Sequence, residues 1–80
     1  MQTANHITAE RIEATENELV LHVRGEILRL PWDRCSSRLA EASTPQRMDA
    51  TLSPGGYGIH WPKLDEDLSV RGLVRLAQAG

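Results

Sequence analysis

Apolar and polar residues alternate in the first third of the chain with the period of two that is typical of β-strands. The segment 19–23 is aliphatic and β-branched, and residues 26–30 repeat the pattern after a two-residue loop. Because that loop sets Val23 opposite Glu26, the register of the hairpin is fixed, and His22 lies on the face away from the core. The predicted core face consists of Leu19, Leu21, Val23, Leu28 and Leu30.

The segment Ile7–Thr15 fits the pattern of either a strand or a helix. We interpret it as a strand, because the hairpin needs a neighbour and because polar residues at 16–18 break the pattern as a turn would. The N-terminal part of the chain is therefore predicted to form a three-stranded antiparallel meander.

Beyond Pro31 the period changes from that of a strand to that of a helix. Pro31 cannot donate to a strand ladder and ends the strand. One amphipathic helix is expected to follow and to lie on the sheet. Its buried stripe consists of Trp32, Cys35, Ser36, Leu39, Ala40 and Ser43. A second, short helix is predicted to start at Ser43, which can form a capping box with Gln46, and Pro45 suits its first turn.

The last third of the chain predicts a second hairpin and a terminal helix. Strands are expected at 50–52 and 57–61, joined by a turn at 53–56. An acidic loop then leads to Ser69, which is a suitable N-cap residue. The apolar stripe of the last helix consists of Val70, Leu73, Val74 and Ala77.

These elements place the chain in the α+β class. The predicted order is a small antiparallel three-stranded N-terminal sheet, a helix, a second β-hairpin and a C-terminal helix. Residues 1–80 are expected to form a single domain, with frayed ends at 1–5 and 78–80.

The composition disfavours some classes of function but does not identify one. The chain has 80 residues, and a domain of this size buries only about 60% of its unfolded surface, so a homo-oligomer stays open as a way to bury more. The net charge of −2 and the pI of about 5.8 disfavour a protein that binds nucleic acid on its own. No apolar run is long enough to cross a bilayer, and the first residues do not resemble a signal peptide. We therefore expect a soluble, cytoplasmic protein.

His60 and the acidic segment Asp65-Glu66-Asp67 suggest a metal site or a general base. The set is poor for either purpose, because a hydrolytic metal usually requires more than one histidine and a hard cation requires several oxygens. We expect the acids to favour the start of the terminal helix through its dipole, and His60 to be a hydrogen-bonded groove residue. No catalytic residue, metal or cofactor is expected, and a metal-dependent enzyme stays as the least favoured alternative.

The single cysteine excludes an internal disulfide and a cysteine-based zinc site. Arginines at positions 34 and 38 would lower the pKa of Cys35, but its place on the apolar stripe predicts an inert core cysteine. Ser36 and Ser37 have no histidine or carboxylate at a motif spacing, so neither is expected to act as a nucleophile.

Each tryptophan adjoins a proline at the end of a strand. Both rings suit the core, yet a half-exposed ring beside an arginine is also typical of interface hot spots. The predicted partner-binding surface consists of Trp32, Arg34, Arg38, His60, Trp61, Asp65, Glu66 and Asp67. The alternative, a nucleic-acid-associated transcriptional regulator, would use the outward arginines of the two main helices, Arg34, Arg38, Arg71 and Arg75.

The run 56–70, with Gly-Ile-His-Trp-Pro followed by Leu-Asp-Glu-Asp, resembles the signature of the bacterial domain-of-unknown-function family DUF2442. Pro31-Trp32 and the Thr-Pro-Gln-Arg element at 44–47 are also similar to that family. The resemblance implies a small α+β domain, free-standing or followed by a helix-turn-helix, whose short members are often encoded next to a small toxin-like partner. It carries over no catalytic residue.

The chain ends at Gly80, so we expect no helix-turn-helix and no DNA binding by that route. The expected function is a non-enzymatic protein-interaction module, the antitoxin or regulatory partner of a toxin–antitoxin pair.

Overall fold

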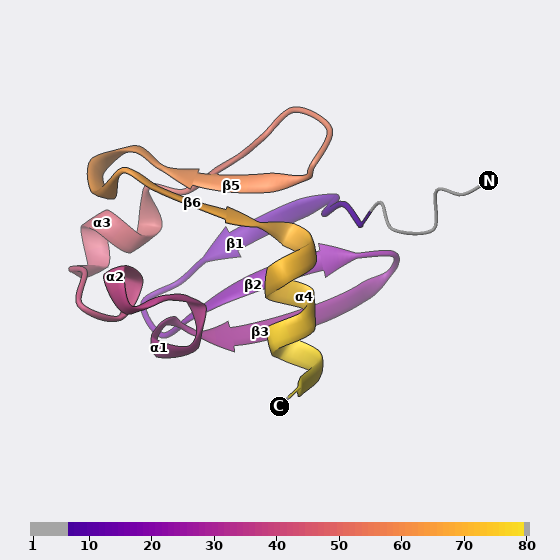
Figure 1. The fold of residues 1–80 in the computed structure, drawn as a ribbon, viewed down its shortest axis with the longest axis horizontal. Coiled ribbons are helices and arrows are strands. Elements are labelled where there is room, and N and C mark those ends of the chain that lie inside the picture. The colour runs from indigo at the N-terminus through magenta and orange to yellow at the C-terminus, as the bar shows by residue number, and fades with distance from the viewer. Residues whose placement is uncertain (1–6, 80) are drawn as a thin grey trace.

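The structure is a computed structural model that describes residues 7–79 (Figure 1). The strands are β1 (Arg11–Ala14), β2 (Glu18–Val23), β3 (Glu26–Pro31), β4 (Thr51–Leu52), β5 (Gly58–Trp61) and β6 (Glu66–Ser69). The helices are α1 (Trp32–Cys35), α2 (Ser37–Ala40), α3 (Thr44–Met48) and α4 (Val70–Ala79), with a 3-10 turn η1 (Pro62–Leu64). This arrangement confirms the α+β class. The ends expected to fray at 1–5 lie outside the described residues, and Gln78 and Ala79 belong to α4.

The first sheet has the order β1-β2-β3 and is antiparallel throughout. Its β2–β3 register is the predicted one, with Val23 opposite Glu26. The connecting residues Arg24 and Gly25 both have positive φ, 54° and 80°, as the tight turn of a two-residue hairpin requires. β1 is shorter than the predicted 7–15, because the amide of Ala9 donates to the Gly56 carbonyl, at 2.8 Å, in the other half of the molecule.

The prediction of one helix after Pro31 is wrong, because Ser36 interrupts it. Ser36 has extended backbone angles, φ −168° and ψ 161°, and separates α1 from α2. Its hydroxyl accepts a hydrogen bond from the amide of Leu39 at 3.1 Å, so it caps α2 instead of filling a place on the apolar stripe. The predicted capping box between Ser43 and Gln46 is confirmed at the start of α3.

The acidic segment is a strand and not the predicted loop. β6 pairs with β5, so the second hairpin becomes a three-stranded antiparallel sheet with the order β4-β5-β6. The alternation at 66–69 explains this outcome, since Leu68 is set opposite the buried Ile59 on one face while Asp67 and Ser69 lie on the other. Ser69 is nevertheless the cap of α4, because its Oγ accepts from the amide of Gly72 at 3.0 Å.

One core joins the two sheets and α4. Figure 1 shows α4 running from the end of β6 across β2 and β3, with α1, α2 and α3 gathered at one end of the molecule. The buried cluster consists of Ala9, Leu19, Leu21, Val23, Leu30, Trp32, Cys35, Leu39, Ile59, Trp61, Val70, Leu73 and Val74. The core is thus aliphatic apart from Cys35 and two indole rings.

Candidate functional site

The tryptophan corner belongs to the core and not to the surface. Trp32 is 2% exposed and Trp61 is fully buried, and the rings meet edge to face with centroids 6.3 Å apart. Each indole N–H finds a backbone acceptor: Trp32 donates to the Thr15 carbonyl at 2.9 Å, and Trp61 donates to the Arg47 carbonyl at 3.0 Å. The expectation that these rings form part of a docking surface is therefore corrected, because buried rings with satisfied N–H groups cannot reach a partner.

Two of the arginines predicted to bind a partner are engaged with the protein's own backbone. Arg34 donates to the carbonyl of Leu76 at 2.9 Å, and Arg38 donates to the carbonyl of Leu64 at 3.2 Å. Both side chains thereby satisfy carbonyls of α4 and η1. Their position on the outer surface agrees with the prediction, but their donors are already partly used.

Arg47, which the sequence did not single out, links α3 to the C-terminal end of α2 and to Trp32 of α1. Its guanidinium donates to the carbonyls of Leu39 and Ala40 at 2.9 and 2.8 Å, and it lies over the ring of Trp32 at 5.9 Å. A planar group with several donors is suited to this combination of forked hydrogen bonding and ring contact. The Thr-Pro-Gln-Arg run was the only signal for it.

His60 and Asp67 form the polar centre of the outer face of the second sheet. They are directly opposite each other on β5 and β6, and His60 Nδ1 is 2.7 Å from Asp67 Oδ1. The amide of Val70 donates to the carbonyl of Tyr57, the residue opposite it. Hydrogen-bonded and non-hydrogen-bonded pairs alternate along an antiparallel ladder, so His60 and Asp67 form a non-hydrogen-bonded pair, in which side chains approach most closely. The predicted hydrogen bond of His60 is confirmed, with Asp67 as its acid partner, while the groove expected around it stays a prediction.

The other two carboxylates of the segment point elsewhere. Asp65 is exposed and has left-handed backbone angles, φ 50° and ψ 46°, which end η1 and redirect the chain into β6. Glu66 is opposite Trp61, so it lies on the other side of β6 from Asp67. None of the three acids occupies the first turn of α4, which carries no acid, and Asp67, two residues before the Ser69 cap, is bonded to His60. We refer to His60, Asp65, Glu66 and Asp67 as the acidic edge, since Glu66 and Asp67 belong to β6, an edge strand of its sheet.

Cys35 lies in the core, as predicted. Burial raises the pKa of its thiol to about 11, with a further contribution from the Asp33 carboxylate. Its Sγ donates to the carbonyl of Pro31 at 3.6 Å. A thiol with this pKa is protonated at neutral pH and is a poor nucleophile.

A second histidine–carboxylate couple lies on the outer face of the first sheet and was not predicted. His22 Nε2 is 2.6 Å from Glu13 Oε2, which also accepts from Arg11 at 2.9 Å. The hydrogen bond to His22 is the main reason that the pKa of Glu13 is lowered. The register of β1 against β2 was the missing information, because β1 could not be aligned from its sequence.

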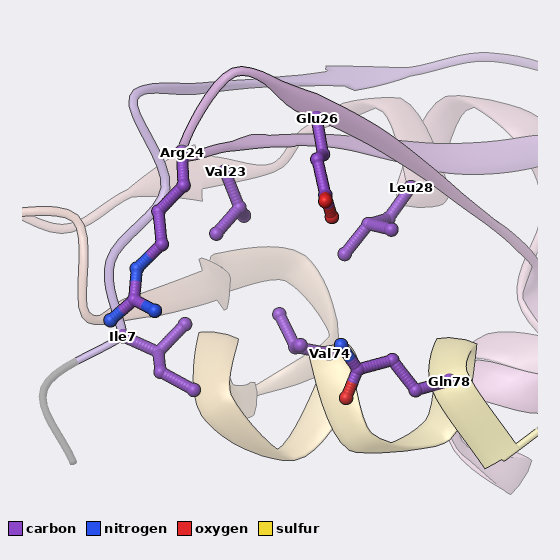
Figure 2. A pocket seen from close by; sticks show the side chains of 7 residues that line it. All are labelled: Ile7, Val23, Arg24, Glu26, Leu28, Val74 and Gln78. Atoms are coloured by element: carbon purple, nitrogen blue, oxygen red, sulfur yellow. The ribbon is translucent and has the colours of Figure 1, made fainter. Parts of the chain in front are cut away.

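The structure also contains a small cavity between the first hairpin and α4 (Figure 2). Its volume is about 220 Å³, and the lining residues are Ile7, Val23, Arg24, Glu26, Leu28, Val74 and Gln78. Ligand pockets are usually about 300–1,000 Å³, so this one is small for a cofactor. None of the residues of the acidic edge contributes to it.

Groups that could hold a metal are not brought together in the part of the chain that the structure describes. Residues 7–79 contain no cluster of three or more histidine, cysteine, aspartate or glutamate side chains suited to a metal ion. Within the same residues, no helix combines the length and apolar character needed to cross a membrane.

The chain matches a protein family and is similar to a solved structure. The model of a protein family described only as being of unknown function, DUF2442, matches residues 9–79. A crystal structure of a protein of unknown function from Rhodospirillum rubrum ATCC 11170 is similar, with a TM-score of 0.76 and 28% sequence identity. The match covers 89% of this chain and 88% of that chain. No curated protein matches the chain.

Proposed function

We propose that this chain, which belongs to the DUF2442 family of proteins of unknown function, is a non-enzymatic protein-interaction module that acts as the antitoxin or regulatory half of a toxin–antitoxin pair. The expectation of a small toxin-like partner comes from the family resemblance. The observation that carries the proposal for this molecule is the acidic edge, in which Asp65 and Asp67 are exposed and Glu66 is half-buried.

Two carboxylates of the acidic edge have no hydrogen-bond or ion-pair partner among residues 7–79. Asp67 is bound to His60, but Asp65 and Glu66 form no side-chain hydrogen bond or ion pair with any residue in 7–79. The edge strand also leaves one side of β6 without a neighbouring strand in its sheet. A basic partner segment could pair with this strand while its cations meet the carboxylates, and such complementarity raises association rates and selects partners.

The chemistry of the remaining groups supports an interaction role over catalysis. Cys35 is a buried, protonated thiol, and His60 is paired with one exposed carboxylate on an open sheet face, with side-chain exposures of 45% and 75%. General acid–base catalysis is strengthened when a closed site excludes water and positions the reacting group. His60 and Asp67 lie at the exposed surface instead.

The test is co-purification of the tagged chain with the product of the neighbouring reading frame, followed by calorimetry on the purified complex. We expect a defined stoichiometry and an affinity that falls as salt is raised. The triple variant Asp65→Asn, Glu66→Gln and Asp67→Asn should weaken binding at least about tenfold. The matched control is Glu16→Gln, an exposed acid in the turn before β2, which should bind as the parent does. Failure to form any complex, or equal affinity of the triple variant and the parent, would count against the proposal.

A further inference from the structure

The arginines on the solvent face of α4 differ from the other arginines, because no partner for them lies among the residues that the structure describes. Arg71 and Arg75 form no hydrogen bond or ion pair with any side chain or carbonyl of residues 7–79. By contrast, Arg11 and Arg29 pair with glutamates, Arg34, Arg38 and Arg47 bind backbone carbonyls, and Arg24 also has an interaction. These two unpaired arginines therefore lie on the same helix, one turn apart.

Their positions are unfavourable for the stability of the helix itself. Arg71 lies in the first turn of α4, directly after Val70, where the positive end of the helix dipole disfavours a cation. Arg71 and Arg75 are four residues apart, and like charges at that spacing destabilise a helix. The helix contains no acid that would offset either effect, since its sequence is VRGLVRLAQA. Positions that break local rules without an internal compensation are expected at functional surfaces.

The same face also exposes an apolar side chain. Leu76 follows Arg75 and is 38% exposed, although Val70, Leu73 and Val74 on the other side of the helix are buried. Arginine beside exposed leucine is a combination that protein interfaces use, because the guanidinium pairs with carboxylates while its stem and the leucine lose water.

We propose that the solvent face of α4, formed by Arg71, Arg75 and Leu76, is a docking surface for an acidic, amphipathic segment of a partner protein. The charge of this face selects the occupant. A second copy of the chain would bring arginines against arginines if the two helices packed face to face, and a second copy docked through its acidic edge would appear as the salt-sensitive dimer that the test below detects. Nucleic acid is disfavoured, because the net charge of the protein is −2 and two cations would neutralise few phosphates. The surface has the opposite sign to the acidic edge, and the proposal does not depend on the function assigned to that edge.

The experiment is an NMR titration of the full chain with a synthetic helical peptide that carries glutamates four residues apart beside leucines. We expect the largest shifts at the α4 residues and a dissociation constant that rises with salt. In the variant Arg71→Gln/Arg75→Gln, the affinity should fall about fivefold or more, while the control Arg11→Gln should bind as the parent does. The same double variant should unfold roughly 2–6 °C above the parent, since it removes the unfavourable charges.

These two readouts separate a docking role from a structural one. A double variant that melts below the parent and binds the peptide unchanged would overturn the proposal. So would stronger binding of an equally charged DNA duplex than of the peptide, or a salt-sensitive dimer of the parent that the double variant abolishes.

Discussion

Gly56 offers the sharpest perturbation of the way the two halves of the molecule join. Its φ is +78°, and a Cβ added there would lie 2.3 Å from the backbone oxygen of Ala9. The same two residues share the hydrogen bond from the Ala9 amide to the Gly56 carbonyl. A backbone atom cannot rotate away as a flexible side chain can, so the variant Gly56→Ala forces the chain ahead of β1 to move.

The magnitude follows from three contributions. Left-handed backbone angles cost alanine about 1–2 kcal/mol relative to glycine, the overpacked contact costs about 1–3 kcal/mol, and loss of the hydrogen bond costs about 1 kcal/mol. Even when each contribution takes its lower limit, their sum is a large part of the free energy of unfolding, which is roughly 4–12 kcal/mol for a domain of this length.

Gly25→Ala is the matched control for that variant. Gly25 has nearly the same φ, +80°, but no atom lies within 4 Å of an added Cβ. It should lose only about 1–2 kcal/mol, through the backbone angles alone. Urea unfolding of both variants and of the parent, followed by tryptophan fluorescence, gives the comparison. The reasoning is refuted if the Gly56→Ala variant is no less stable than the Gly25→Ala variant.

Three further predictions follow from contacts described above. Cys35 should react with a thiol reagent at pH 8 at least about a hundredfold more slowly in the folded protein than in urea, because its pKa is raised from the ordinary 9.0 to about 11; similar rates would contradict this. Arg47→Lys should lower the unfolding free energy by about 1–3 kcal/mol, nearly as much as Arg47→Ala, because lysine cannot reproduce the forked contacts; full stability of the lysine variant in a urea titration would contradict it. The folded pKa of Glu13 is lowered, chiefly by the His22 hydrogen bond, so its stabilising contribution is present above the ordinary pKa of 4.5 and is lost as the pH falls through the folded value. The difference in urea midpoint between the parent and Glu13→Gln should therefore shrink below about pH 4.5, and a constant difference from about pH 6 to pH 3 would show that the reasoning is wrong.

Local signals in the sequence were sufficient wherever a short stretch determines its own geometry. The register of β2 against β3 follows from a two-residue turn and the alternation of leucines on either side. The capping box at Ser43 and the cap at Ser69 each depend on a hydroxyl and an amide three residues away. In these cases no distant part of the chain competes with the local preference.

One error arose where two local preferences compete, and two arose where a distant segment decides the outcome. Ser36 fits the helical period, but its hydroxyl caps α2 and its backbone is extended, so the helix is interrupted there. The segment 66–69 is acidic and resembles a loop in sequence, but it forms a strand because it pairs with β5. Trp61 adjoins a proline at a strand end, yet its ring is buried because Arg47 supplies a carbonyl from α3. The partners of β6 and of the Trp61 indole cannot be identified from sequence spacing.

The acidic edge was found by its composition, and only the structure separates its members. The sequence shows three successive carboxylates and a histidine seven residues before the last of them. The strand pairing assigns Asp67 to His60 and leaves Asp65 and Glu66 without an internal partner. The register of β5 and β6 decides that Asp67 lies on the side of His60 and Glu66 on the side of Trp61.

Hydrogen exchange on the chain alone and in complex with the product of its neighbouring reading frame tests the central claim most directly. If the acidic edge is the docking surface, amide protection should increase at residues 65–69 and extend to β5, while β2 exchanges as it does in the free protein. Unchanged exchange at 65–69 in a complex of defined stoichiometry would contradict the account.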